Sequence, residues 1–383
     1  LGQSPVFDGS PMIAARELGF FDDVGLEVNV RAFGDIGGVG EGVASGTLDG
    51  GLFGDQGAMP RIGNLGNITF GISGDVFQGY AIIGRPGENL TFGQALRETG
   101  DRDLAIQRTM EGMRGKTLIT LLGTGMEGFL RTALGKADMT IDELDILEMN
   151  SPEGATAFLR GEGDLQLGDI PSRFRVEEEG GVPVITAGEV GPPAIMMVGY
   201  VFNTDWLEES EDTALRLVGA WYRAIDSLQV NRDETLEIMY KWVNEESGTS
   251  FDLSQAKWIQ ENVSPWPTFE EAADVFYEPG ADMYLPDRLE YVIDFWESNG
   301  TIPVGKVTVA SASDAQRLYD RLVELKAETE SLLEAVEGVA AADLPSGSQD
   351  QFAALVSSAR YHHQIRNYLD AARFARAAVE LSQ

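Results

Sequence analysis

Short apolar runs alternate with amphipathic stretches along the first half of the chain. This alternation is typical of an α/β fold, in which strands and helices follow one another. Ser10 followed by Pro11 predicts a helix start, because a cap residue there precedes a proline in the first turn. In this block the pattern predicts helices at 10–18 and 37–45, and strands at 26–30, 51–53 and 68–85.

A second block repeats the pattern. It predicts strands at 117–122, 145–149, 165–167 and 182–185, and helices at 124–134 and 151–160. From 210 onwards the pattern is strongly helical. Residues 312–383 are rich in Ala and Glu, and they predict two or three helices interrupted at 344–348.

One short motif occurs in both blocks. Residues 45–49 (SGTLD) lead through an apolar stretch to Gly54-Asp55, and residues 160–164 (RGEGD) lead in the same way to Gly168-Asp169. The simplest explanation is two lobes of similar design that face each other across a cleft. We expect lobe 1 at 1–87 and 200–310, lobe 2 at 88–199, and a C-terminal helical extension at 311–383.

Charge excludes several classes of partner. The formal net charge is −34, whereas binding to nucleic acid or to anionic lipid requires a basic surface. Lys contributes 6 and Arg 22 of the basic residues, a composition that suggests adaptation to concentrated salt, which melting in rising sodium chloride would test. No apolar run reaches 18 residues, so we expect no membrane-spanning segment. The first residue is Leu, which suggests a processed or trimmed N-terminus from which a signal segment could have been removed.

The chain offers few reactive side chains. It has no Cys, and its two histidines, His362 and His363, lie in the C-terminal block, so we expect neither a metal nor a cofactor. The segment Gly123–Gly128 fits the Gly-x-Gly-x-x-Gly pattern of dinucleotide sites after a predicted strand, and a nicotinamide-dependent oxidoreductase is therefore one alternative. Glycines are also common at any strand-to-helix corner, so the pattern alone does not decide.

Polar and aromatic residues gather at the predicted corners, where helix N-termini and strand ends favour ligand binding. Buried carboxylates beside aromatic rings favour a cation or an N–H-rich heterocycle. Tyr80 also lies near these corners. The candidate ligand-binding residues are Phe7, Asp8, Ser10, Asp55, Gln56, Asp75, Phe77, Thr124, Asn150, Asp169 and Tyr200.

The order of several segments resembles a known family over about residues 3–305: PMIAARELGFF at 11–21, GLEV at 25–28, SGTLD at 45–49, GKTL at 115–118, GTG at 123–125, GD at 163–164 and DIP at 169–171. The chain is similar to substrate-binding proteins of ABC importers, in the class for nitrate, sulfonate, taurine and thiamine-pyrimidine precursors. The resemblance implies a two-lobed, periplasmic-binding-protein-like α/β fold with crossing hinge strands. It places Arg85-Pro86 and residues 197–201 near the hinge, and Asp8, Asp55, Thr124 and Asp169 in the cleft.

We therefore expect a non-enzymatic receptor that captures a small polar ligand, with an amine or N-heterocycle favoured, and delivers it to an ABC permease. Its expected location is extracytoplasmic, either periplasmic or anchored at the cell surface. A sensory or scaffolding protein that uses the C-terminal helices is the second alternative. The relatives include a suicidal pyrimidine synthase that relies on His and Cys, and the absence of both from the body of this chain argues against that activity.

Overall fold

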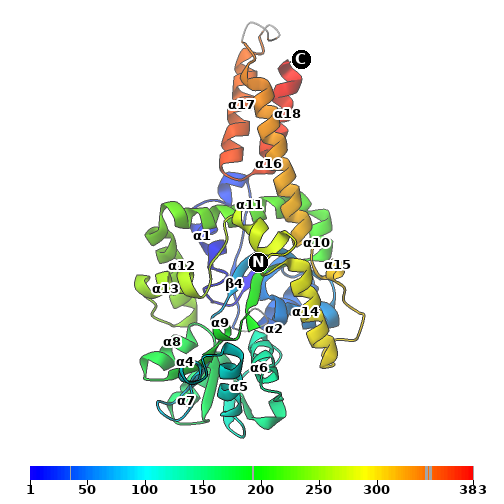
Figure 1. Cartoon of the computed structure of the whole chain (residues 1–383). Coiled ribbons are helices and arrows are strands. Elements are labelled where there is room, and N and C mark those ends of the chain that lie inside the picture. Colours follow the sequence, from blue (N-terminus) through cyan, green and yellow to red (C-terminus); the bar gives the residue numbers. More distant parts are fainter. Residues whose placement is uncertain (35, 192–193, 341–343, 345–346, 383) are drawn as a thin grey trace.

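The computed structural model describes residues 1–34, 36–191, 194–340, 344 and 347–382. Two five-stranded sheets form the centres of two bodies, and a narrow helical projection rises from the upper one (Figure 1). We refer to the body around the first sheet as lobe 1 and to the body around the second as lobe 2. The expected α/β two-lobed fold with a helical extension is confirmed.

The first sheet has the order β2-β1-β3-β10-β4. Its strands are β1 (Gly2–Gln3), β2 (Arg31–Ala32), β3 (Gly50–Gly54), β4 (Ile68–Phe77) and β10 (Met196–Asn203). Strands β1, β2 and β3 are parallel, while β10 is antiparallel to β3 and β4. The helices of this lobe are α1 (Ser10–Glu17), η1 (Asp22–Val24), α2 (Ile36–Ala44), α3 (Asp55–Leu65), α10 (Thr204–Glu209), α11 (Glu211–Val230), α12 (Arg232–Ser247), α13 (Leu253–Asn262), η4 (Ala273–Tyr277), α14 (Leu285–Ser298) and α15 (Val309–Ala312).

The second sheet has the order β7-β6-β8-β5-β9. Its strands are β5 (Ala81–Gly84), β6 (Thr117–Thr120), β7 (Asp145–Glu148), β8 (Leu165–Gly168) and β9 (Val182–Thr186). Its helices are α4 (Phe92–Thr99), α5 (Arg102–Glu111), α6 (Gly125–Gly135), η2 (Ile141–Glu143), α7 (Ser151–Leu159), α8 (Ser172–Glu178) and α9 (Ala187–Val190). The parallel and antiparallel pairs fall at the same places as in the first sheet. The repeated motif has a structural basis, because β3 and β8 each hold the third place in their sheets.

In the order of the described elements, the chain passes from the first sheet to the second between β4 and β5, and it is back in the first sheet at β10, after α9. The first crossing lies at 77–81, and β5 belongs to lobe 2, so Arg85 is beyond the expected hinge and donates to the Gly163 carbonyl instead. The prediction of a strand at 26–30 is wrong. The strand that pairs with β1 is β2, which begins only at Arg31. The expected bounds at 87 and 199 differ from the sheets, because β5 (Ala81–Gly84) belongs to lobe 2 and β10 (Met196–Asn203) belongs to lobe 1. The bound at 310 remains a proposal.

The described residues of the C-terminal block form α16 (Ala315–Glu337), α17 (Gln349–Gln364) and α18 (Tyr368–Ser382), which pack together and project away from both sheets (Figure 1). We call this bundle the stalk. The predicted interruption at 344–348 includes residues 345–346, which lie outside the described residues. The base of the stalk is part of lobe 1, because Leu318, Leu322 and Leu325 are buried in the main core.

An ion pair network fixes the stalk at its base. Arg366, between α17 and α18, binds the carboxylates of Asp226 and Glu270, which belong to lobe 1. Beside it, Tyr319 of α16 stacks on Tyr277 with ring centroids 4.2 Å apart. The stalk therefore extends lobe 1 as one packed unit. Within the described residues, no helix is long and apolar enough to cross a membrane.

Candidate functional site

The carboxyl ends of the parallel strands in both lobes point into the gap between the sheets, where open α/β proteins bind ligands. Asp8 follows β1, Asp55 follows β3, and Asp169 follows β8 at the equivalent place in lobe 2. Asp169 raises the pKa of Asp8, so these carboxylates from opposite lobes lie close enough to interact. The expectation that the two matched corners face each other agrees with this geometry.

Three carboxylates converge in the gap. Burial raises the pKa of Asp8 to about 7, with Asp169 adding to the effect. Burial and the charge of Asp8 raise the pKa of Asp75 on β4 well above its usual range. Burial also raises the pKa of Asp169, partly offset by the Ser151 hydroxyl. We call Asp8, Asp75 and Asp169 the acid triad.

Asp55 has a different role from the triad. Its Oδ2 accepts from the Arg288 Nε at 2.5 Å, Oδ1 accepts from Arg288 Nη2 at 3.2 Å, and the Asp55 carboxylate is fully buried. Oδ1 also accepts from the Gln56 amide at 2.7 Å. Because its charge is already paired with Arg288 on α14, Asp55 supports the site rather than offering a free carboxylate.

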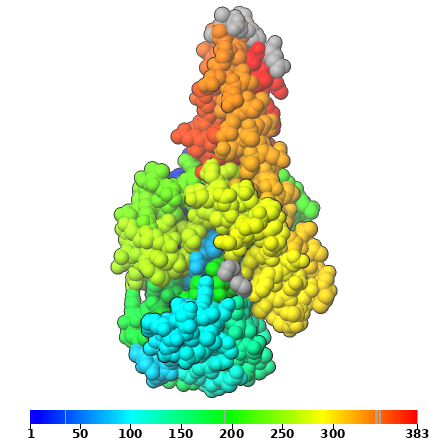
Figure 2. Space-filling view, in the orientation of Figure 1, coloured from blue at the N-terminus to red at the C-terminus, as the bar shows by residue number. Residues whose placement is uncertain are grey.

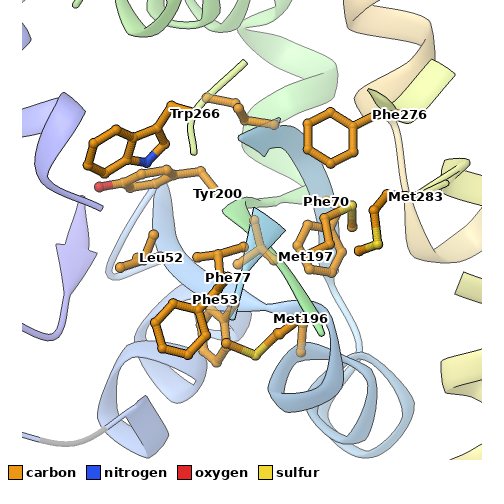
Figure 3. Packing of buried hydrophobic residues seen from close by; sticks show 14 of the residues in the cluster. Leu52, Phe53, Phe70, Phe77, Met196, Met197, Tyr200, Trp266, Phe276 and Met283 are labelled. Atoms are coloured by element: carbon orange, nitrogen blue, oxygen red, sulfur yellow. The ribbon is translucent and has the colours of Figure 1, made fainter. Parts of the chain in front are cut away.

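Aromatic rings form walls around the triad. Phe7 packs on Trp266 with centroids 5.5 Å apart, and the Trp266 Nε1 donates to the Asp8 carbonyl at 3.1 Å. Phe77 meets Tyr80 edge-on at 4.9 Å. Burial raises the pKa of Tyr80, and the charges of Asp169, Asp8 and Asp55 raise it further. Tyr80 therefore lies near two members of the triad and near Asp55. Figure 3 shows the adjoining core, with Phe77, Met196 and Trp266 around the first sheet.

Other predicted residues are engaged within their own lobe. The Ser10 hydroxyl donates to the Phe7 carbonyl at 2.5 Å, and the cap of α1 is Gly9 rather than Ser10. Thr124 caps α6 by accepting from the Met126 amide. The remaining two are Asn150, whose side chain caps α7 at the surface, and Tyr200, which is fully buried and donates to the Gln3 side chain.

Two glycines of the Gly123–Gly128 corner leave room for the side chains of Tyr80 and Gln56, which pack against them. A Cβ added at Gly125 would stand 2.5 Å from the Tyr80 hydroxyl, and one at Gly128 would stand 1.1 Å from Gln56 Oε1. Gln56 belongs to α3 of lobe 1, so Gly128 provides room for close contact between the lobes. The contact gives these glycines a packing role without a dinucleotide.

Sequence reasoning missed several residues of the gap. Trp266, Ser264 and Arg288 lie far along the chain from the corners and only the fold brings them there. Ser264 and Trp266 belong to the segment Ser264-Pro265-Trp266-Pro267, in which prolines flank an aromatic ring. Prolines restrict the backbone on both sides of the ring, a signal that could have marked this loop as a fixed wall.

The lobes touch on both sides of the triad. On one side the hydroxyls of Thr132 (α6) and Tyr291 (α14) are 3.1 Å apart. On the other, Gln255 (α13) donates to Glu178 (α8) at 2.7 Å, and the Phe174 ring lies 5.4 Å from Trp258. Figure 2 shows the region where the two lobes meet. Asp75 is fully buried and Asp169 is half-buried, so a ligand would reach Asp75 only after the structure opens.

Two surface hollows lie outside this gap. One of about 310 Å³ lies between α8 and α13, with Phe174 and Trp258 in its wall. Another of about 580 Å³ lies at the foot of the stalk, beside Arg317 and Asp320. Within the part of the chain that the structure describes, no group of three or more His, Cys, Asp or Glu side chains is arranged to hold a metal ion.

The pKa of Asp8 makes stability depend on pH. Because its pKa rises from 3.8 to about 7 on folding, ionisation at higher pH works against the folded state. The ligand-free protein should therefore lose about 2–4 kcal/mol of unfolding free energy from this group as pH rises from 4 to 8. Urea unfolding at several pH values should show this loss in the wild type and a smaller one in Asp8→Asn. Equal pH slopes in the two proteins would contradict the assignment.

Comparison with solved structures shows the fold. The periplasmic aliphatic sulphonate-binding protein SsuA of Escherichia coli matches with a TM-score of 0.61 and 12% identity, over 82% of this chain and 90% of that one. The SsuA of Xanthomonas axonopodis bound to MOPS matches with 0.61 and 13%, over 82% and 96%. The periplasmic nitrate-binding protein NrtA of Synechocystis matches with 0.58 and 14%, over 90% of each chain.

An enzyme also shares this fold. The desulfurization enzyme DSZB matches with a TM-score of 0.53 and 13% identity, over 84% of this chain and 98% of that one. Identities this low speak for the architecture only, so the architecture is common to receptors and to at least this enzyme. No curated protein sequence matches the chain.

The expected resemblance to sulfonate- and nitrate-binding proteins is thus confirmed at the level of fold. At the level of sequence, the model of the NMT1-like family matches residues 1–244 of the 383. The match includes β1 to β10, and therefore both sheets and the acid triad. The chain belongs to the NMT1-like family.

Proposed function

We propose that this protein is a solute receptor of an ABC importer, which captures a small polar molecule between its lobes and delivers it to a membrane permease. The observation that carries the proposal is the buried acid triad, drawn from both lobes, at a place that opens only if the lobes move apart. Two crossing segments connect the lobes, which is the arrangement that permits hinge closure around a ligand.

Delivery to a permease implies an extracytoplasmic protein, periplasmic or anchored at the cell surface. The similar proteins whose printed names state a location are periplasmic, which supports this part of the proposal. The stalk is an addition that a partner could contact, because it extends lobe 1 away from the gap (Figure 1). A sensory or scaffolding role for the stalk remains the alternative that uses this feature.

For the ligand we propose an amine or nitrogen heterocycle. The printed names of the similar structures state sulfonate and nitrate as ligands of those proteins. In this chain, Asp8, Asp75 and Asp169 line the gap, and carboxylates repel an anion but attract a positive or N–H-donating group.

We propose that the protein is not an enzyme. The body of the chain has neither Cys nor His, which leaves carboxylates as its main groups for acid–base chemistry. A nicotinamide-dependent oxidoreductase is the alternative enzyme, and the close packing of Tyr80 and Gln56 on Gly125 and Gly128 disfavours it. Calorimetric titration with NAD distinguishes the two, because only the alternative expects tight binding.

The test of the receptor is capture of a solute. The purified protein is equilibrated with a small-molecule cell extract, freed of unbound compounds by gel filtration and denatured, and the released compounds are identified by mass spectrometry. We expect one or a few small polar compounds in near-stoichiometric amounts, and a smaller radius of gyration in X-ray scattering with the extract than without it. Closure around the ligand is the reason for the smaller radius.

The matched control is Gly128→Leu, which places a side chain where Gln56 of lobe 1 now lies. Since the added atoms wedge the lobes apart, this variant should retain less of the compound and should not contract. If the wild type retains nothing and its radius does not change, the receptor proposal is wrong.

A further inference from the structure

Asp75 is a buried ionisable group for which the described residues provide no ion-pair partner. It lies on β4, two residues before the crossing to lobe 2, and it is fully buried. Among the described residues, no hydrogen-bond partner meets either carboxylate oxygen, although the Ser264 hydroxyl and the Val76 amide lie near enough to lower the pKa of Asp75 in part. An unpartnered buried carboxylate is costly, so this position requires a proton or a positive group from outside the chain.

The neighbours of Asp75 increase this requirement. Asp8 raises the pKa of Asp75, and Asp169 raises that of Asp8. No Lys or Arg of the described chain is among the groups that shift these three pKa values. Arg288, the nearby arginine on α14, is already bound to Asp55. The described residues therefore supply no positive partner to these three carboxyl groups.

Two uncharged side chains also point to a ligand. The Gln56 Oε1 and the Ser264 Oγ are buried and have no hydrogen-bond partner among the described residues. The amide oxygen can only accept a hydrogen bond, so its missing partner is a donor. Gln56 belongs to α3, away from the chain segments of the acid triad, whereas Ser264 belongs to the Ser-Pro-Trp-Pro segment and lies beside Asp75.

The aromatic walls suit the apolar part of a cation. Phe77 and Tyr80 meet edge-on at 4.9 Å, and Phe7 and Trp266 pack at 5.5 Å. Aromatic faces attract a positive group and exclude water from it. Neither the carboxyl groups nor the aromatic faces favour binding of an anion.

We propose that Asp75, with Asp8 and Asp169 beside it, binds the positively charged, N–H-bearing head of an organic cation, such as a protonated amine or a guanidinium group. The inference rests on the proposed receptor function and narrows its ligand class to cations that donate hydrogen bonds. Asp75 is the primary anchor because, of the three carboxyl groups of the triad, it is the one that is fully buried and whose two oxygens have no hydrogen-bond partner among the described residues. Gln56 and Ser264 accept the remaining N–H groups.

The test uses simple head-group probes at constant ionic strength. Melting is followed with butylammonium, benzylammonium and butylguanidinium, and with tetramethylammonium, taurine, nitrate and benzyl alcohol as comparators. We expect a saturable rise in melting temperature with at least one of the first three. Tetramethylammonium should be weaker because it has no N–H group. Stabilisation by none of the three cations, or by tetramethylammonium more than by all of them, overturns the inference.

The variant Asp75→Asn removes the anchor without harming the fold. It should raise the melting temperature of the free protein, since it removes an unpaired buried charge, and it should weaken binding of the effective probe at least tenfold. The matched control Asp226→Asn alters a carboxylate at the base of the stalk, outside the gap, and should leave probe affinity unchanged. Unchanged probe affinity in Asp75→Asn overturns the role of Asp75.

The outcomes separate this inference from the receptor proposal. If taurine or nitrate stabilises the protein and contracts it in X-ray scattering while the cations do not, the receptor stands and the cationic ligand class is wrong. If a cation binds in an Asp75-dependent manner but the lobes do not close, the cation site stands and the receptor proposal fails.

Discussion

Arg288→Ala should lower the free energy of unfolding by about 3–5 kcal/mol, because it leaves the buried carboxylate of Asp55 without its counter-ion. The pair is unusually well shielded, since the side chains are only 6% and 0% exposed. Arg288 binds both oxygens of the Asp55 carboxylate, so two charge-assisted hydrogen bonds disappear together. Urea unfolding of the wild type and the variant at pH 7 gives the difference directly.

Two further variants show whether the loss comes from the isolated charge. Adding Asp55→Asn to an Arg288→Met variant should recover part of the loss, because the uncompensated carboxylate is then gone. Arg321→Ala removes an exposed pair with Glu324 and should change stability by no more than about 0.5 kcal/mol. A loss of less than about 1 kcal/mol in Arg288→Ala would mean that Asp55 is protonated or solvated rather than paired.

A chain that ends at residue 312 should fail to fold. It lacks α16, whose Leu318, Leu322 and Leu325 are buried in the main core of lobe 1. The Tyr319 hydroxyl also donates to the Phe269 carbonyl at 2.9 Å. Each large apolar side chain contributes about 1.5–3 kcal/mol on burial, so losing several exceeds the usual stability margin of about 5–15 kcal/mol. Circular dichroism and solubility of the 1–312 protein are the measurements.

The matched control shortens the stalk and keeps its base. Replacing residues 331–356 by a short Gly-Ser linker removes the far part of α16 and the beginning of α17, but it retains the buried leucines and α18. This variant should fold and bind ligand, so it is the proper test of a sensory or scaffolding role for the stalk. A soluble 1–312 protein that melts cooperatively would show that α16 is dispensable to lobe 1.

Local sequence signals were sufficient for much of the fold. Ser10-Pro11 marked the start of α1 although the cap itself is Gly9, and Gly-Asp after an apolar stretch marked the ends of β3 and β8. The matched corners were enough to predict two similar lobes. The strand expected at 26–30 failed because alternation describes which side chains are buried, whereas the strand itself depends on pairing with β1, which begins only at Arg31.

The site was only partly predictable, because its properties depend on distant partners. Asp55 and Asp75 look alike in sequence, yet Asp55 meets Arg288 of α14 across 233 positions of the chain, whereas Asp75 meets no cation. Ser10 was expected to face a ligand, but its hydroxyl is satisfied by Phe7 three residues earlier. Pairing, rather than residue type, separates supporting carboxylates from those that remain available.

Because Arg366 and the tyrosines at its base tie the stalk to lobe 1, we expect the stalk to stay fixed on lobe 1 when lobe 2 rotates. One dye near the far end of the stalk and another on lobe 2 would report such a rotation. Because the stalk is long, a small rotation would give a large change in the distance between the dyes. The chain contains no cysteine, so two introduced thiols would be labelled without background. The stalk thus offers a place from which single-molecule fluorescence could follow the opening of the protein.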